Sequence, residues 1–276
     1  MIGEHVLAGY APDSGGREAL ALAGAIVEHT HGRLTVGAVY PPDRVAAAGE
    51  ANTLLEQAGG LLAERPAGVA VGFATQFATQ ESRSVGRGLS SLAGKVGADL
   101  IVMGSPPGGA RGRIGVSSTA DNLLHSATEA VMLAPSGYAP PPQGLERITV
   151  MYVQRPQADE AVTRAAIAAI TLGVPLRLLT LAVGDAPAGR LRDDLALAIR
   201  LAQDSSGLPA EEVSAGLAEG DDVADALGDA DWLPGEILVC ASSEDAAAHR
   251  VFLGEVALKV LRAAPCPVTV LPRGYT

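Results

Sequence analysis

Short apolar runs alternate with longer segments of helical periodicity along the whole chain. Segment 14–30, for example, has apolar residues spaced by three and four positions, which predicts a helix: Ala19, Leu22, Ala23, Ile26 and Val27. In the first half, the apolar runs predict strands at 5–10, 34–40, 69–77, 100–103 and 130–134. The segments between them predict helices at 14–30, 45–63 and 83–96, and a shorter one after residue 117. Such alternation is typical of a parallel sheet with crossover helices.

The second half repeats the first at a constant offset. Residues 124–138 read LHSATEAVMLAPSGY and residues 261–275 read LRAAPCPVTVLPRGY, so the prolines are 272 − 135 = 137 positions apart. The apolar run 100–104 aligns with 237–241 at the same offset. The chain is therefore expected to hold two tandem units of roughly 140 residues, at 1–143 and 144–276, joined by the proline-rich segment 136–144.

The second unit has its own set of predicted elements. Its strands are expected at 148–153, 176–182, 212–215, 236–241 and 268–271, and its clearest helices at 160–171, 191–203 and 252–263. Each unit thus has five parallel strands with helices on both faces, which is a doubly wound α/β fold. Ligands of such folds bind at the carboxyl ends of the strands. In the first unit, that rule brings the residues after position 10, Val39 and the loop at Gly104 to one crevice.

Composition narrows the class of protein. The chain has 276 residues, 48% of them hydrophobic and 3% aromatic, with a net charge of −11. A folded α/β core of small aliphatic side chains fits these values, and the acidic balance argues against nucleic-acid binding. No uncharged apolar run reaches the ~18 residues of a membrane span, and the first residues do not resemble a signal peptide. We therefore expect a cytoplasmic protein, with Cys240 and Cys266 as buried thiols.

A glycine-rich loop follows the fourth predicted strand and is the strongest candidate site. It reads GSPPGGARGRIG over 104–115, and Arg111 and Arg113 are the only formal charges between Asp99 and Asp121. Ser118 and Asp121 have the S-x-x-D spacing of a capping box. A strand, a glycine loop and a helix start form a favourable anion site, because free N–H groups and the helix dipole attract negative charge. A plain surface connection is the alternative reading.

These features resemble the universal stress protein family. The resemblance rests on 9-GY-10 followed by 15-GGREAL-20, on 103-MGS-105 with its glycine loop, and on 123-LLHS-126 before a strand that ends in Ala134-Pro135. It covers both halves, as in the tandem members found in actinobacteria. It implies a fold similar to that of the adenine nucleotide alpha hydrolases, with ATP held by a G-x2-G-x9-G-[S/T] motif.

The motif is only partly kept in the first unit. Its four positions fall on Gly104, Pro107 (with Gly108 next to it), Ser117 and Ser118, so two of the four match. The acidic residue that holds adenosine in the family falls on Ala11, and Asp13 lies two positions on. The resemblance implies a first-unit nucleotide site, and the candidate residues are Ala11, Asp13, Val39, Gly104, Ser105, Gly108, Gly109, Arg113, Ser117 and Ser118.

The second unit departs further from the motif. The same spacing falls on Ala241, Glu244, Gly254 and Glu255, and a carboxylate at the helix start would repel phosphate. We expect this unit to be a structural partner. An acidic cluster, which begins at Asp221 and Asp222, is expected to be a solvated helix face rather than a cation site.

Three functional readings follow. The first is a non-enzymatic stress-response protein that binds ATP in its first unit, with no catalytic residue and no metal. The second is a scaffold that has lost the nucleotide site, and the third is a slow ATPase. Duplicated units of this kind are expected to pair through their fifth strands within one chain, as a pseudo-dimer of the kind single-unit relatives form, and a homodimer of the whole chain is possible.

Overall fold

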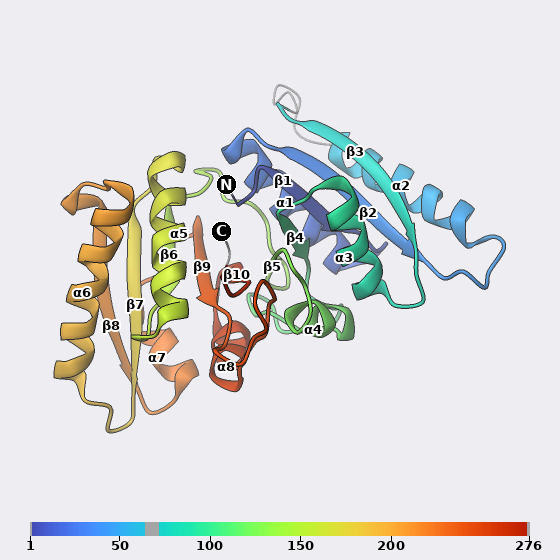
Figure 1. Ribbon diagram of the computed structural model, residues 1–276. Coiled ribbons are helices and arrows are strands. Elements are labelled where there is room, and N and C mark those ends of the chain that lie inside the picture. Colours follow the sequence, from blue (N-terminus) through green and yellow to red (C-terminus); the bar gives the residue numbers. More distant parts are fainter. Residues whose placement is uncertain (1, 64–71, 275–276) are drawn as a thin grey trace. The chain divides into compact units, whose positions relative to one another are not determined.

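The computed structural model describes residues 2–63 and 72–274, which divide into two compact units after Pro140 (Figure 1). Unit 1 begins with β1 (His5–Gly9), α1 (Ser14–Thr30), β2 (Arg33–Tyr40) and α2 (Ala47–Ala63). It continues with β3 (Ala74–Glu81), α3 (Val85–Val96), β4 (Leu100–Met103), α4 (Ser118–Leu124) and β5 (Ala130–Leu133). Its strands lie in the order β3-β2-β1-β4-β5, and every neighbouring pair is parallel.

Unit 2 has the same order of elements. Its first part is β6 (Arg147–Met151), α5 (Pro156–Leu172), β7 (Leu176–Val183), α6 (Ala188–Ser206) and a 3₁₀ turn at Ala210–Glu212. Next come β8 (Val213–Gly220), α7 (Val223–Asp229), β9 (Glu236–Ala241), α8 (Glu255–Ala263) and β10 (Val268–Leu271). The parallel strands follow the order β8-β7-β6-β9-β10. The predicted doubly wound α/β fold is confirmed for both units.

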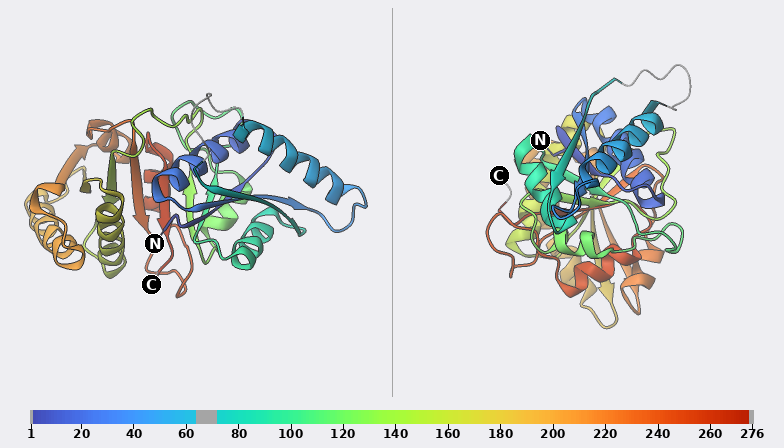
Figure 2. Two further views of the ribbon diagram at one scale, coloured as in Figure 1. Left: turned by 90° about the horizontal axis from the view of Figure 1, so that it is seen from above. Right: turned by 90° about the vertical axis from the view of Figure 1, so that its right-hand side faces the viewer.

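Helices cover both faces of each sheet. In unit 1, α1 contacts α2 on one face and α3 contacts α4 on the other, which Figure 2 shows as blue and green helices on opposite sides of the strands. This division follows from right-handed crossovers: the chain moves from β1 out to β3, then reverses to reach β4 and β5. The reversal between β1 and β4 is a topological switch point, where the carboxyl ends of the strands leave a crevice.

Capping residues explain why some helices have their predicted bounds. Asp13 precedes α1 and accepts a 2.8 Å hydrogen bond from the Gly16 amide, and His31 ends the helix in the left-handed conformation. Ser84 caps α3 in the same way, and Gly97 ends it. The helix at 14–30 was predicted from its apolar periodicity alone, and the structure shows that the Asp13 cap fixes the same start.

Several predicted bounds were wrong. The third strand was expected at 69–77 but is Ala74–Glu81; residues 69–71 lie outside the described part. It is the edge strand of unit 1 and is half polar, so apolar content does not mark it. β8 extends to Gly220 rather than 215 for the same reason. Helix α5 begins at Pro156, four residues before the predicted start at 160. The prediction missed its first turn because that turn has no pattern of large apolar residues.

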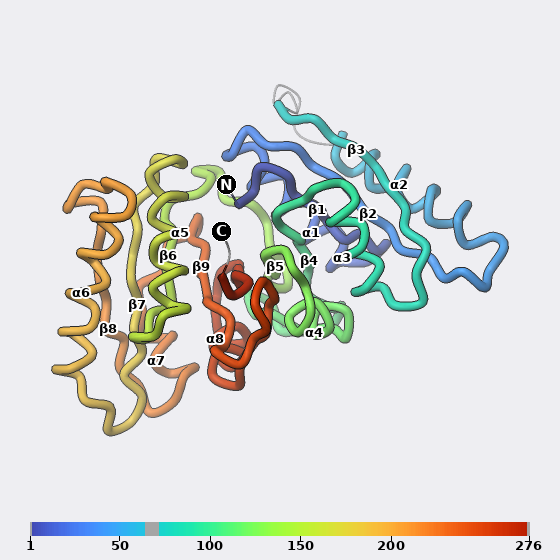
Figure 3. The backbone as a smooth tube through the Cα atoms, in the orientation of Figure 1, coloured from blue at the N-terminus to red at the C-terminus, as the bar shows by residue number. Residues whose placement is uncertain are grey.

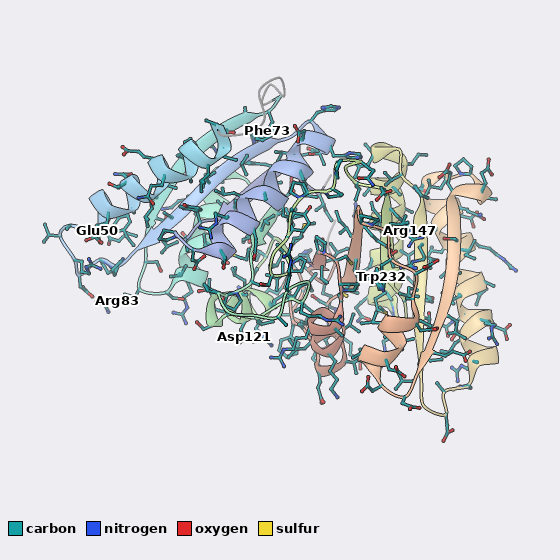
Figure 4. All side chains as sticks on the ribbon, turned by 180° about the vertical axis from the view of Figure 1, so that it is seen from behind. Glu50, Phe73, Arg83, Asp121, Arg147 and Trp232 are labelled. Carbon is teal, nitrogen blue, oxygen red and sulfur yellow. The ribbon has the colours of Figure 1, made fainter. Side chains whose placement is uncertain are left out.

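A buried ionic cluster lies at the amino ends of the strands of unit 2. Glu236, 1% exposed, accepts hydrogen bonds at 2.7 Å from both Arg147 and Arg177 and also binds the Thr149 hydroxyl. The Arg177 guanidinium lies 4.8 Å from the centre of the Trp232 ring. Figure 4 labels Arg147 and Trp232 at this end of the unit. Two arginines and the Thr149 hydroxyl therefore donate to the Glu236 carboxylate, and the Trp232 ring packs against one of the arginines.

Both cysteines are buried and free, as the sequence predicted. Burial raises the pKa of Cys240 to about 12, so its thiol stays protonated at neutral pH.

Candidate functional site

A cavity of about 260 Å³ lies in unit 1 at the carboxyl ends of β1, β2 and β4. Strand-end residues form its floor: Gly9, Tyr10, Gly37, Val39 and Met103. The turn between β1 and α1 adds Ala11, Asp13, Gly15 and Gly16, and helix α3 adds Val85 and Leu89. The loop after β4 and the start of α4 complete it with Gly104, Ser105, Pro106, Pro107, Ser117 and Thr119. Figure 3 follows the backbone from β4 to α4.

Two glycines allow the backbones around the cavity to meet. A Cβ added at Gly104 would overlap the backbone of Gly15, and a Cβ added at Gly15 would overlap the Ser105 carbonyl. The turn before α1 and the loop after β4 are therefore in direct main-chain contact. Glycine at position 104 is required by this packing whether or not a phosphate is bound there.

Ser105 anchors the loop. Its side chain is 1% exposed, donates a hydrogen bond to the Ala134 carbonyl at 2.8 Å and accepts one from the Gly115 amide at 3.0 Å. The hydroxyl thus joins both ends of the loop to the end of β5. Because its proton is already donated, Ser105 shapes one wall of the cavity rather than offering a free donor.

The same anchor is present in unit 2. Ser242, which is 137 positions after Ser105, donates to the Leu271 carbonyl at 2.7 Å and accepts from the Phe252 amide at 3.1 Å. Each partner is also displaced by 137. The anchor therefore belongs to the fold of both units and is independent of any ligand.

Asp13 contributes the charged side chain of the cavity. One carboxylate oxygen caps α1 through Gly16, and the residue is half-buried. Burial raises the pKa of the neighbouring Tyr10; the Arg17 cation opposes this shift and Asp13 adds to it. Tyr10 therefore keeps its proton at neutral pH and presents a hydroxyl group.

Six of the ten candidate residues come together at the cavity: Ala11, Asp13, Val39, Gly104, Ser105 and Ser117. The other four, Gly108, Gly109, Arg113 and Ser118, do not line it. The loop turns away after Pro107 and is exposed from there to Arg111. At α4 the capping residue is Ser117, whose hydroxyl accepts from Ala120 at 3.1 Å, so the predicted capping box between Ser118 and Asp121 is wrong.

Sequence reasoning missed several lining residues, notably Val85, Leu89, Met103 and Thr119. Val85 is the clearest case, because it is an apolar side chain that is 47% exposed at the first position of α3. The sequence does place Val85 directly after Ser84, the residue that caps α3, and this was the one indication that it stands at a helix start. Which strand and helix ends converge cannot be derived from spacing alone.

Unit 2 has side chains where unit 1 has glycine. Helices α1 and α5 both span 17 residues and begin 156 − 14 = 142 positions apart, so Gly9, Gly15 and Gly37 correspond to Met151, Gln157 and Leu179. Gly104 corresponds to Ala241 at the offset of 137. A hollow of about 10 Å³ bordered by Gln157 and Ala241 lies along α5 and the end of β10, not over the ends of β6 and β7. Met151 and Leu179 place side chains where unit 1 has the strand-end glycines of its cavity.

The acidic residues of unit 2 border a separate, open hollow of about 500 Å³ between the ends of β7 and β8 and the start of α7. Asp222 caps α7 through two backbone amides, and Asp225 accepts from the Asp221 amide. Among residues 2–63 and 72–274, no group of three or more His, Cys, Asp or Glu side chains is arranged to hold a metal ion. The acidic side chains here act as helix caps and a solvated face.

Comparisons with known proteins agree with this architecture. The profile of the universal stress protein family matches twice, at residues 3–135 and 144–272. Universal stress proteins of Mycobacterium tuberculosis (strain H37Rv) and Mycobacterium bovis are each 34% identical over 217 residues, covering 74% of this chain and 74% of theirs.

Solved structures show the same fold. A universal stress protein from Archaeoglobus fulgidus has a TM-score of 0.70 at 17% identity, covering 99% of this chain and all of that one. A putative universal stress protein from Pseudomonas aeruginosa has a TM-score of 0.65 at 16% identity, covering 97% and 92%. None of the helices in the described residues is long and apolar enough to cross a membrane. The chain belongs to the universal stress protein family, with one family domain in each unit.

Proposed function

We propose that this universal stress protein binds an adenine nucleotide in the cavity of unit 1 and acts in the stress response as a binding protein rather than an enzyme. The observation that carries this proposal is the cavity itself, at the switch point where doubly wound folds bind ligands. Part of its lining is apolar, with Val39, Val85 and Leu89 suited to a flat base. Hydroxyl-bearing residues also line it, namely Tyr10, Ser117 and Thr119.

The test is titration calorimetry of the nucleotide-stripped protein with ATP, ADP and AMP. Val39→Trp would place a large ring in the cavity, and the matched control is Leu181→Trp at the corresponding place in unit 2. We expect saturable binding that Val39→Trp abolishes and Leu181→Trp leaves unchanged. Absence of heat and of thermal stabilisation with every nucleotide at millimolar concentration would refute the proposal.

The proposal assigns unit 2 a structural role. Met151 and Leu179 stand where unit 1 has strand-end glycines, and Glu255 stands in the first turn of α8, where a carboxylate opposes a phosphate. Pairing of the two units as a pseudo-dimer remains a prediction of the sequence, and a homodimer of the chain remains another; sedimentation of the protein would test the second.

The nucleotide-free scaffold is the alternative supported by the exposed loop after Pro107, since Gly108, Gly109 and Arg113 do not reach the cavity. Failure of the titration would favour it.

The slow ATPase needs a group that activates water, and Asp13, the carboxylate at the cavity, is engaged as a helix cap. Phosphate release above that of a Val39→Trp control would support hydrolysis.

A further inference from the structure

The cavity of unit 1 has an unusual charge for a nucleotide site. Among the described residues that line it, Asp13 is the one with a formal charge at neutral pH, and no Lys, Arg or His is present. Asp13 is only half-buried and lines the space that a ligand would occupy. A phosphate brought into this space would therefore meet a negative charge and no lining cation to offset it.

The cations of the surrounding elements are directed elsewhere. Arg111 packs against Gly137, with its side chain close to where a Cβ of that glycine would lie. Arg83, just before α3, is 3.6 Å from Asp43. Arg17 on α1 and Arg113 in the loop are exposed and do not line the cavity, although the Arg17 charge is near enough to lower the pKa of Tyr10 against the effect of burial.

The amides that could receive a phosphate are partly occupied as well. The Gly16 amide at the start of α1 donates to Asp13, the Ala120 amide in α4 donates to Ser117, and the Gly115 amide in the loop donates to Ser105. Fewer free N–H groups therefore point into the cavity than a glycine loop at a helix start would provide.

The size of the cavity also disfavours a ligand with several phosphates. Its volume of about 260 Å³ is below the roughly 300–1,000 Å³ of common ligand pockets. An adenine ring and a ribose account for much of such a space, so a chain of phosphates would extend into solvent beside Asp13.

From these observations we propose that the cavity selects adenine ligands of low negative charge, adenosine or a monophosphate, over the triphosphate. This inference rests on the proposed adenine site and adds its ligand class. Asp13 is the residue that sets the preference, because it supplies the charge that repels additional phosphates.

The experiment compares adenosine, AMP, ADP and ATP by calorimetry on the full chain, at low salt and without divalent cations. We expect affinity to fall as phosphates are added, with ATP at least about fivefold weaker than adenosine, the effect of one partly screened charge interaction. Asp13→Asn keeps a good capping residue and should bring the ratio of adenosine affinity to ATP affinity towards one. Asp185→Asn, which makes the same change in net charge on the exposed surface of unit 2, should leave the ratio unchanged.

Two outcomes would overturn the inference while the adenine site stands: ATP binding as tightly as adenosine or more tightly, or an Asp13→Asn variant with an unaltered ratio. If none of the four compounds binds, the proposed function fails and the inference fails with it. If the ratio of adenosine affinity to ATP affinity decreases as salt is raised, the preference for adenosine is electrostatic in origin.

Discussion

At the scale of single residues, buried polar groups make several roles visible that sequence could not assign. His5 is 3% exposed, and its Nε2 lies 2.7 Å from the Thr35 hydroxyl, which also accepts from Gln76. Burial, together with the nearby Arg33 cation, lowers the pKa of His5 from its ordinary value of 6.5. The folded state therefore favours the neutral ring.

This His5 environment predicts a pH dependence of stability. The unfolded chain takes up a proton on His5 below about pH 6.5 and the folded chain does so less readily, so the free energy of unfolding should fall as pH is lowered from 7.5 to 5.5. Urea denaturation across this range measures it. His5→Gln should flatten the dependence, whereas His31→Asn, at an exposed left-handed position where Asn is tolerated, should not. An unchanged slope in His5→Gln would contradict the argument.

Ser105 supports a second prediction at this scale. Ser105→Ala removes the acceptor of the Gly115 amide and the donor to Ala134, so the variant should lose roughly 1–3 kcal/mol of stability, with faster amide exchange at Gly115. Ser242→Ala should cost a similar amount through Phe252 and Leu271. A loss confined to one unit would show that the two anchors are not equivalent.

The candidate residues show how far sequence could define the site. Gly104 and Ser117 were found because strand, loop and helix follow each other directly in the chain. Gly108, Gly109 and Arg113 were assigned because they belong to the glycine-rich, positively charged loop, and the loop carries them away from the cavity. Val85 and Thr119 reach the cavity only through tertiary packing, which spacing does not encode.

At the scale of elements, capping and burial decide which bounds are predictable. Helix α1 and strands β4, β9 and β10 have the predicted bounds because their apolar runs are buried and clearly ended. The position of strand β3 was predicted wrongly because it is an edge strand, with polar residues on a half-exposed surface. The start of α8 was placed three residues early because Phe252 is apolar but bonds to Ser242 in the loop.

The ionic cluster that joins β6, β7 and β9 gives a prediction at this scale. Glu236→Ala would leave Arg147 and Arg177 without their buried carboxylate, so we expect a loss of about 3–5 kcal/mol in the free energy of unfolding. The exposed pair of Arg192 and Glu219, 3.5 Å apart, is the control, and Glu219→Ala should cost under about 1 kcal/mol. Equal losses in the two variants would show that the burial of Glu236 does not determine its contribution.

At the scale of the whole molecule, the two units share their framework but differ at the glycines around the cavity of unit 1. Both units retain the serine anchor and a carboxylate that accepts from the glycine after the fifth strand, Glu18 with Gly137 and Glu160 with Gly274. These contacts fix the backbone around each loop. The cavity depends instead on strand-end and turn glycines, which only unit 1 has at these places, so the fold and the site could diverge independently.

This difference between the units predicts one bound ligand per chain, and protection from hydrogen exchange that is limited to unit 1. Because Met151, Gln157 and Leu179 stand in unit 2 where unit 1 has glycine, a saturating adenine ligand should slow hydrogen exchange at the carboxyl ends of β1, β2 and β4 and leave those of β6, β7 and β9 unaffected. Calorimetric stoichiometry should be near one. Gln157→Gly alone should not create a second site, since Met151 and Leu179 remain. A stoichiometry of two, or equal protection in both units, would show that side chains at the three glycine positions do not exclude the ligand.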